Sequence, residues 1–354
     1  MVGILHTADL HRGAHSAHPI YNTRVIPELV NLAIRKQCDY ILVVGDIFDK
    51  AKPDQTVKDY LVRQLLDAKQ QINFIFVPGN HDYTTKALEY HSLNYLLYLR
   101  EASNYKVNIQ VVEPGEYSTF KNLSVFVMQE WGNVDIAAKE NNGTKPLIIA
   151  WHGLVPGLQF SNIVHVPKET TNSIKKILSS TNAQYIALGD IHQPIELHQR
   201  CWYPGPPVQK AYSDKDGVLL VTMNMQKIMV KKYQLPLPKK ITLEVAFEEG
   251  VDSEETIIEF ITNKVPANNF LKLKFELPLK VWGALNRSYI QETLKDHCLE
   301  IKLENDPIPD AHIRKSIEKV SKAKSLQQEI DIVLDEENYG LDKDKLRKTC
   351  RKYL

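Results

Sequence analysis

The chain has 354 residues, of which 43% are hydrophobic and 25% are charged, which is the balance of a soluble globular protein with a sizeable core. Its length predicts two domains, or one large domain with appendages. The formal net charge of +1 excludes a global field of the kind that marks a nucleic-acid binder, although local basic patches stay open, and no apolar run approaches the roughly 18 uncharged residues of a membrane span.

The N-terminus has no basic flank, and it reaches Asp9 and His11 too early for a signal peptide. The cysteines form no Cys-x-x-Cys pair and stand far apart, at positions 38, 201, 298 and 350. This spacing argues against a zinc knuckle and against a disulfide framework, and it favours a reducing compartment. We therefore expect a cytoplasmic protein that does not enter a membrane.

The first 235 residues alternate between apolar runs, which predict buried strands, and segments with helical spacing. The predicted strands lie in the ranges 2–11, 39–49, 72–82, 107–112, 123–130, 146–153 and 183–193. The predicted helices lie in the ranges 26–38, 57–68 and about 88–99. Continuous apolar runs flanked by helical patterns predict a largely buried sheet with helices on its faces.

A linker is predicted at residues 234–240, "QLPLPKK", where two prolines and two lysines interrupt the pattern. Beyond it, alternating apolar residues predict strands at 241–247, 271–277 and 299–304, with helices at 254–264 and about 287–297 between them. Asp252, with Glu255 three residues later, is predicted to cap the first of these helices. The pattern indicates a compact β-α-β-α-β module over about 236–305.

The C-terminal residues have the pattern of a charged helical hairpin. From about Ser316, apolar residues recur on one helical face; Gly340 can end that helix, and Asp342 can begin a second. We therefore predict three regions, at 1–235, 236–306 and 307–354.

Five of the strand-like runs end in Asp, Asn or His, at the carboxyl end of the strand, where open α/β sheets bind their ligands. These residues are Asp9, His11, Asp46, Asn80, His81, His152, Asp190 and His192. Any one of the five segments could be a simple turn, because Gly, Asn and Asp are turn residues. All five in the same position and in order favour a shared site.

Carboxylate, amide and imidazole ligands without a thiolate suit manganese or iron better than structural zinc. A carboxylate has two oxygens with which to bridge a pair of metals, and Asp46 is the expected bridge. Two cations about 3.5–4 Å apart can bind a phosphate oxygen, lower the pKa of a bound water and stabilise an in-line displacement. The strand ends therefore predict a two-metal centre.

The same segments resemble the calcineurin-like metallophosphoesterases, and within them most closely the SbcD-type DNA repair exonucleases, the bacterial counterparts of the eukaryotic meiotic-recombination nuclease. The resemblance rests on "GDIFD" (45–49), "VPGNHD" (77–82), "ALGDIH" (187–192) and "YPGPPVQ" (203–209). It implies an α/β fold, a metallophosphoesterase β-sandwich flanked by helices, with a small α+β capping domain that binds DNA and a C-terminal helical hairpin.

By this resemblance, Asp9, His11, Asp46 and His192 would bind a first metal, and Asp46, Asn80, His152 and Asp190 a second. His81 would assist cleavage without binding metal, and the cofactors would be two Mn²⁺ ions, with Mg²⁺ as the alternative. Many relatives have Gly-His-x-His where this chain has Gly-Asp-Ile-His. Asp190 is therefore expected to be a substitute ligand, or else an acid beside a metal that lacks one ligand. Asp49 and Asp82 are expected to cap loops or to accept from ligand histidines.

The resemblance implies a nuclease subunit that hydrolyses DNA phosphodiester bonds in repair, recombination or end processing. Its implied partners are DNA and an SbcC-type coiled-coil ATPase bound through the tail, with a homodimer of this chain inside a heterotetramer. A compact chain with a short tail would also suit a bacteriophage version acting in the host cytoplasm. The alternatives are a metallophosphoesterase for another phosphate ester, and a partner-recruiting scaffold with a weakened site. No substrate-binding residue is assigned.

Overall fold

A computed structural model describes residues 1–14, 18–68, 72–84, 90–102, 108–158, 166–246 and 253–308. The chain divides into two compact units, Met1–Lys239 and Lys240–Leu354. The helical hairpin predicted for the tail lies outside the described residues, and its fold and its partner stay predictions.

The first sheet of the first unit has the strand order β12-β11-β1-β2-β3-β4. Its parallel part consists of β1 (Val2–Thr7), β2 (Tyr40–Val44), β3 (Asn73–Val77) and β4 (Ile109–Val111). The strands β11 (Val218–Met223) and β12 (Ile228–Tyr233) continue the sheet antiparallel to β1. The sheet is therefore mixed.

The second sheet has the order β5-β6-β7-β8-β10-β9 and is also mixed. Here β6 (Ser124–Val127), β7 (Leu147–His152), β8 (Tyr185–Gly189) and β10 (Cys201–Tyr203) are parallel. The strands β5 (Tyr117–Thr119) and β9 (Ile195–His198) are antiparallel edges. The apolar runs of the sequence therefore belong to two sheets, as in a β-sandwich, and not to one sheet.

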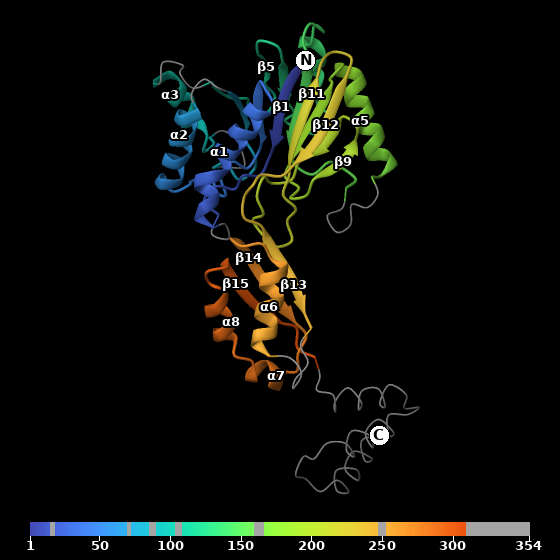
Figure 1. Cartoon of the computed structure of the whole chain (residues 1–354). Helices are drawn as coiled ribbons and strands as arrows, with labels where there is room; N and C mark the ends of the chain where they lie inside the picture. The colour runs from blue at the N-terminus through green and yellow to red at the C-terminus, as the bar shows by residue number, and fades with distance from the viewer. Residues whose placement is uncertain are drawn as a thin grey trace, which may run out of the picture. The chain divides into compact units, whose positions relative to one another are not determined.

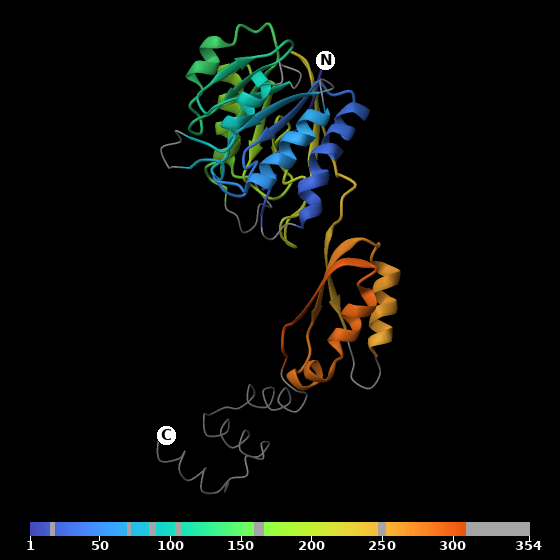
Figure 2. The same cartoon turned by 90° about the vertical axis from the view of Figure 1, so that its left-hand side faces the viewer.

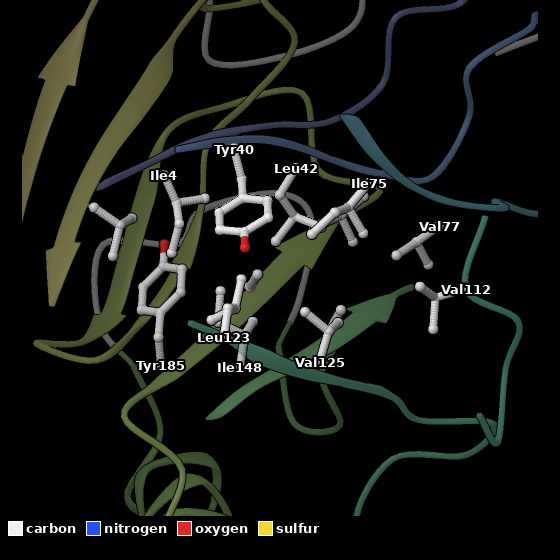
Figure 3. Close-up of a cluster of buried hydrophobic side chains, with 14 of the residues drawn as sticks. Ile4, Tyr40, Leu42, Ile75, Val77, Val112, Leu123, Val125, Ile148 and Tyr185 are labelled. Atoms are coloured by element: carbon white, nitrogen blue, oxygen red, sulfur yellow. The ribbon is translucent and has the colours of Figure 1, made fainter. Parts of the chain in front are cut away.

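The main core lies between the two sheets. Figure 3 shows Ile4, Tyr40 and Leu42 of the first sheet facing Ile148 and Tyr185 of the second. All of these side chains are almost fully buried, and burial of a large aliphatic side chain stabilises a fold by about 1.5–3 kcal/mol. The continuous apolar runs form strands because both faces of each sheet are covered.

Helices cover the outer faces of the sandwich (Figure 1). The helices α1 (Pro19–Arg35) and α2 (Gln55–Ala68) lie side by side over the first sheet (Figure 2). The helix α5 (Lys168–Thr181) covers the second sheet with Ile174, Ile177 and Leu178. Two shorter helices, α3 (Asn94–Ala102) and α4 (Asp135–Glu140), complete the unit. The sequence predicted a helix from about residue 88, but the described residues before Asn94 are not helical.

The second unit contains a three-stranded sheet in the order β13-β14-β15. Its strands β13 (Lys240–Val245), β14 (Asn269–Phe275) and β15 (Cys298–Asn305) are all parallel. The helices α6 (Glu254–Lys264) and α8 (Arg287–Leu294) pack on this sheet, and α7 (Leu279–Ala284) precedes α8. The unit is therefore a parallel α/β arrangement and not the predicted α+β arrangement.

The cap of α6 also differs from the prediction. Ser253, and not Asp252, is the N-cap, and its side chain accepts from the backbone N–H of Thr256. Ser253 and Thr256 form the reciprocal capping box that the sequence assigned to Asp252 and Glu255. Among the described residues, no helix combines the length and the apolar character that a membrane crossing requires.

Candidate metal centre

The structure brings all eight predicted site residues to one edge of the sandwich. The parallel strands β1, β2 and β3 of the first sheet and β7 and β8 of the second deliver their carboxyl ends there. Each of the eight lies within 4.0 Å of another member through at least one polar atom; they are Asp9, His11, Asp46, Asn80, His81, His152, Asp190 and His192.

The first candidate group is Asp9, His11 and His192, whose ligand atoms lie within 4.8 Å of one another. The Nε2 atoms of His11 and His192 are 3.1 Å apart. If two imidazole nitrogens each lay about 2.1 Å from one cation, with a right angle between the two nitrogen–cation bonds, the nitrogens would be about 3.0 Å apart. The spacing of the two histidines therefore fits adjacent positions around one ion.

Asp46 lies between the first candidate group and His152, which belongs to the residues expected around the second metal. Its Oδ2 lies 3.7 Å from Nε2 of His11 and 4.0 Å from Nε2 of His81, and its Oδ1 lies 3.3 Å from Nε2 of His152. Asp46 takes part in two of the candidate metal-binding groups, one with His11 and His81 and one with Asp9 and His152. The two oxygens of one carboxylate thus face two different sets of ligands, which is the arrangement of a bridging residue.

His152 is surrounded by the residues expected around the second metal. Its Nε2 lies 3.1 Å from Oδ1 of Asn80 and 4.0 Å from Oδ1 of Asp190. The backbone N–H of Asp190 also donates to both carboxylate oxygens of Asp9 at 3.1 Å. Asp190 therefore orients Asp9 through its backbone N–H and turns its own carboxylate toward His152.

All four histidines present Nε2 to the centre because each Nδ1 faces an oxygen atom outside it. His152 donates to the carbonyl of Val44 at 3.0 Å, and His81 donates to the carbonyl of Asp49 at 2.8 Å. The remaining two face carboxylates: His11 faces Asp49 at 3.3 Å, and His192 faces Asp214 at 3.5 Å. Such outer partners fix the tautomer and the ring orientation of a metal-binding histidine.

The backbone of the loops is shaped for close approach. The φ angles of Asp9, His11, Asp46 and Asp190 are positive, at 55°, 41°, 48° and 102°. A Cβ atom at Gly45 would lie 1.8 Å from Nδ1 of His152, and one at Gly79 would lie 2.2 Å from Oδ1 of Asp46. Strained residues of this kind persist where surrounding contacts over-determine them, and they cluster at functional sites.

Asp82 joins two of the loops, as the sequence predicted for a loop cap. Its carboxylate accepts from the backbone N–H groups of Ile47, Phe48 and Gly79 at 2.9–3.1 Å, and from the hydroxyl of Ser92. The loop that follows β2 and the turn that follows β3 are therefore held together behind the centre.

Sequence reasoning missed Lys210 and Asp214, which support the centre from the loop after "YPGPPVQ". The ammonium of Lys210 lies 2.6 Å from Oδ1 of Asp49 and 3.5 Å from Nδ1 of His11. Tyr203, the first residue of that motif, donates to the carbonyl of Gly153 at 2.7 Å and accepts from the N–H of Val155 at 3.0 Å. The motif "YPGPPVQ" pointed to this loop, but the sequence alone does not reveal which atoms of the centre the loop approaches.

In the metal-free centre, the carboxylates and the imidazoles shift one another's pKa values. Burial raises the pKa of Asp9 to about 7, although the nearby His152 and His192 oppose the rise. Burial also acts upward on Asp46, but its hydrogen bond and charge interaction with His152 hold the pKa of Asp46 at about 2. The same interaction outweighs burial at His152 and raises its pKa to about 10. A proton thus occupies this acidic cluster, and a cation that binds there must displace it.

A family model described as calcineurin-like phosphoesterase matches residues 2–218. This range is more than half of the chain and contains the whole centre, so the chain belongs to the calcineurin-like phosphoesterase family. Within the family it shows distant similarity to the Mre11, or SbcD-type, nucleases.

Two curated relatives carry that similarity, and both are named DNA double-strand break repair protein Mre11. The protein of Saccharolobus solfataricus is 31% identical over 87 residues, 23% of each chain. The protein of Sulfolobus acidocaldarius is 27% identical over 142 residues, 36% of each chain. The matches therefore span about a quarter and about a third of these relatives' length.

Solved structures also align with the chain. The protein TT1561 of Thermus thermophilus aligns with 13% identity and a TM-score of 0.41, over 65% of this chain and 98% of that one. The nuclease MPE of Pseudomonas putida aligns with 16% identity and a TM-score of 0.24, over 40% of this chain and 57% of that one. Both TM-scores are below 0.5, so neither likeness bears on the function of this chain.

Proposed function

We propose that the chain is a metal-dependent DNA nuclease that hydrolyses phosphodiester bonds, as an exonuclease and endonuclease, at a two-metal centre. The observation that carries the proposal is the position of Asp46, which turns one oxygen toward His152 and the other toward His11 and His81. A carboxylate between two sets of inward-facing nitrogens is suited to hold two cations close together.

The donor set fits a pair of divalent cations of intermediate hardness. The residues proposed for the first cation are Asp9, His11, Asp46 and His192, and those for the second are Asp46, Asn80, His152 and Asp190. Oxygen and imidazole ligands without a thiolate favour Mn²⁺, with Mg²⁺ as the alternative. Bound there, such cations would supply Lewis acidity toward a phosphate and a nucleophilic hydroxide at neutral pH.

His81 is the residue best placed to handle a proton of the reaction. Its side chain is 42% exposed, in contrast to the almost fully buried Asp46 beside it. The Nδ1–H bond to the carbonyl of Asp49 fixes the ring and leaves Nε2 facing the centre, 4.0 Å from Oδ2 of Asp46. From there His81 can give a proton to the leaving oxygen or donate a hydrogen bond to the phosphate.

DNA is the proposed substrate because two relatives with sequence similarity to this chain are named for DNA double-strand break repair. The proposed partner is a coiled-coil ATPase of the SbcC type, bound through residues 307–354, with two copies of this chain in a heterotetramer. The amphipathic pattern of that tail in the sequence supports this assembly. DNA contact by the second unit, as a capping domain, belongs to the same proposal.

The experiment that tests the function compares substrates at one metal concentration. Purified protein is incubated with Mn²⁺ and linear duplex DNA, and in parallel with bis-p-nitrophenyl phosphate and p-nitrophenyl phosphate. We expect cleavage of DNA and of the diester, with little hydrolysis of the monoester. Monoester hydrolysis without DNA cleavage would indicate a phosphatase, and metal binding without any hydrolysis would indicate a partner-recruiting scaffold.

A further inference from the structure

A cavity of about 760 Å³ lies beside Asp214, the residue that faces Nδ1 of His192. It is called the lateral groove here and is lined by Pro194, Gln209, Asp214, Lys215, Asp216, Gly217, Lys232, Tyr233 and Gln234. It lies on the outer side of His192, because Oδ2 of Asp214 is 3.5 Å from Nδ1 of His192, the ring nitrogen that faces away from the centre. The backbone N–H of Lys215 also donates to the carbonyl of His192 at 3.1 Å.

The two acidic residues of the lateral groove already have hydrogen-bond or ion-pair partners within the protein. Asp214 accepts from the backbone N–H groups of Lys210 and Ala211 at 2.9 and 2.7 Å and faces His192. Asp216 forms an ion pair with Lys239. Each of the two acids is only 8% exposed, so neither presents much negative charge to a ligand.

The exposed charges of the lining are two lysines. Lys215 lies in the loop after β10, and Lys232 lies on the edge strand β12. The ammonium of Lys232 is 5.4 Å from the centre of the Trp202 ring. The half-buried Tyr233, whose ring centre lies 4.8 Å from Nζ of Lys36, and the exposed Gln234 also line the groove.

Cationic side chains combined with aromatic rings along a groove are the features that bind single-stranded nucleic acid. A small phosphate ester ends at the metals and places nothing in the groove. A polynucleotide continues past the cleaved bond and needs a path for its next phosphates. The lateral groove lies next to His192 through Asp214, and its volume of about 760 Å³ is within the range of sites that bind ligands of nucleotide size.

We infer that the lateral groove binds the sugar–phosphate backbone of the nucleic-acid strand next to the bond that is cleaved, with Lys215 and Lys232 contacting its phosphates. This inference rests on the proposed nuclease function and names a substrate-binding site for it. Neither lysine contacts a residue of the metal centre through its side chain among the interactions of the described residues, so both can be changed without removing a ligand.

The test uses Lys215→Ala and Lys232→Ala, with Lys231→Ala as the matched control. Lys231 is the neighbouring exposed lysine of β12 and does not line the lateral groove. Binding of a single-stranded oligothymidylate is measured with Ca²⁺ in place of Mn²⁺ and across a range of salt concentrations. Hydrolysis of bis-p-nitrophenyl phosphate with Mn²⁺ is measured on the same preparations.

Loss of one phosphate contact should lower the slope of log affinity against log salt by about 0.7. Relative to 1 M salt, this corresponds to about fourfold weaker binding at 0.15 M salt for each groove variant. We expect that loss in Lys215→Ala and Lys232→Ala, wild-type binding in Lys231→Ala, and unchanged hydrolysis of the small diester in all three.

Equal salt slopes in the wild type and in both groove variants would overturn the inference, and so would an equal loss in Lys231→Ala. Failure of the nuclease function gives a different result. In that case the wild-type protein hydrolyses the small diester but cleaves no DNA, whatever the slopes are.

Discussion

The Nε2 atoms of His11 and His192 lie 3.1 Å apart, although 181 positions separate the two residues in the sequence. His11 follows β1 of the first sheet, and His192 follows β8 of the second. The buried His6 of β1 makes a second link between the same two strands, because its imidazole contacts the hydroxyl of Tyr185 at 3.0 Å and the carbonyl of Leu188 at 3.1 Å. The metal centre therefore depends on how the two sheets are held together, and not only on its loops.

His6 makes the stability of the metal-free protein sensitive to acid. Burial lowers the pKa of His6 to about 3 from an ordinary value of 6.5, so the neutral ring donates from Nε2 to Leu188 and accepts from Tyr185. Below pH 6.5 the unfolded chain takes up a proton that the folded chain does not. The stability that depends on a neutral His6 is thus complete above pH 6.5 and is lost as the pH falls toward 3.

We predict that His6→Gln is destabilised by about 1–3 kcal/mol at pH 7, through loss of buried hydrogen bonds. Because glutamine does not titrate, the difference from the wild type should shrink by about 1.4 kcal/mol for each pH unit below 6.5. Urea unfolding of both metal-free proteins at pH 7, 6 and 5 measures this. Parallel pH profiles would show that the folded protein can protonate His6.

Asp49 is predicted to support the first metal without binding it. Its carboxylate faces Nδ1 of His11 and pairs with Lys210, and loss of such an outer partner weakens metal affinity by about 10- to 100-fold. We expect that loss in Asp49→Asn, measured by Mn²⁺ titration. The control is Asp54→Asn, since Asp54 is exposed and pairs with Lys50 in the same segment. Equal Mn²⁺ affinities in the two variants would show that Asp49 does not support the first metal.

His81→Ala is predicted to lose turnover and keep both metals. Nε2 of His81 lies 4.0 Å from Oδ2 of Asp46, and the side chain of His81 is 42% exposed. Loss of a general acid or of a phosphate hydrogen bond should lower the turnover of DNA by about 10²- to 10⁴-fold. Metal content of the purified variant is the deciding measurement. If a metal leaves with the side chain, His81 is a ligand.

The carboxylate of Asp190 is predicted to be a ligand of the second metal. Its carboxylate faces Nε2 of His152 at 4.0 Å, so we expect Asp190→Ala to weaken one metal selectively and Asp190→His to restore it. A neutral imidazole in place of a carboxylate should also shift preference from Mn²⁺ toward softer cations such as Co²⁺ or Zn²⁺. Metal titration of the three proteins tests this. Equal affinity for both metals in all three would leave Asp190 with only its backbone bonds to Asp9.

The position of the centre could be predicted from the sequence because it depends on local rules. A strand that ends in a polar residue sends that residue to the edge of its sheet, and five of the predicted strands ended in Asp, Asn or His. Asp82 could also be predicted as a loop cap, since turn residues favour that role. These features need only the order of the elements and the chemistry of their ends.

The division into two sheets could not be predicted in this way. Buried strands of either sheet have the same continuous apolar pattern, because both faces are covered in each. Lys210 and Asp214 were missed for a related reason. They reach His11 and His192 through a loop whose path is set by tertiary packing, including the hydrogen bonds of Tyr203. Parallel pairing in the second unit, by contrast, agrees with the predicted β-α-β-α-β order, because a helical crossover between neighbouring strands makes them parallel.

The most direct test of the two-metal centre is the manganese content of Asp46→Ala beside that of the wild type. Asp46 turns one oxygen toward His11 and the other toward His152, so its loss would remove the ligand that the two cations are proposed to share. Isothermal titration with Mn²⁺ should give two sites per chain in the wild type. In a folded Asp46→Ala protein it should give at most one site, with no measurable DNA cleavage. Two intact sites in Asp46→Ala, or manganese-dependent cleavage at more than a few per cent of the wild-type rate, would contradict the account.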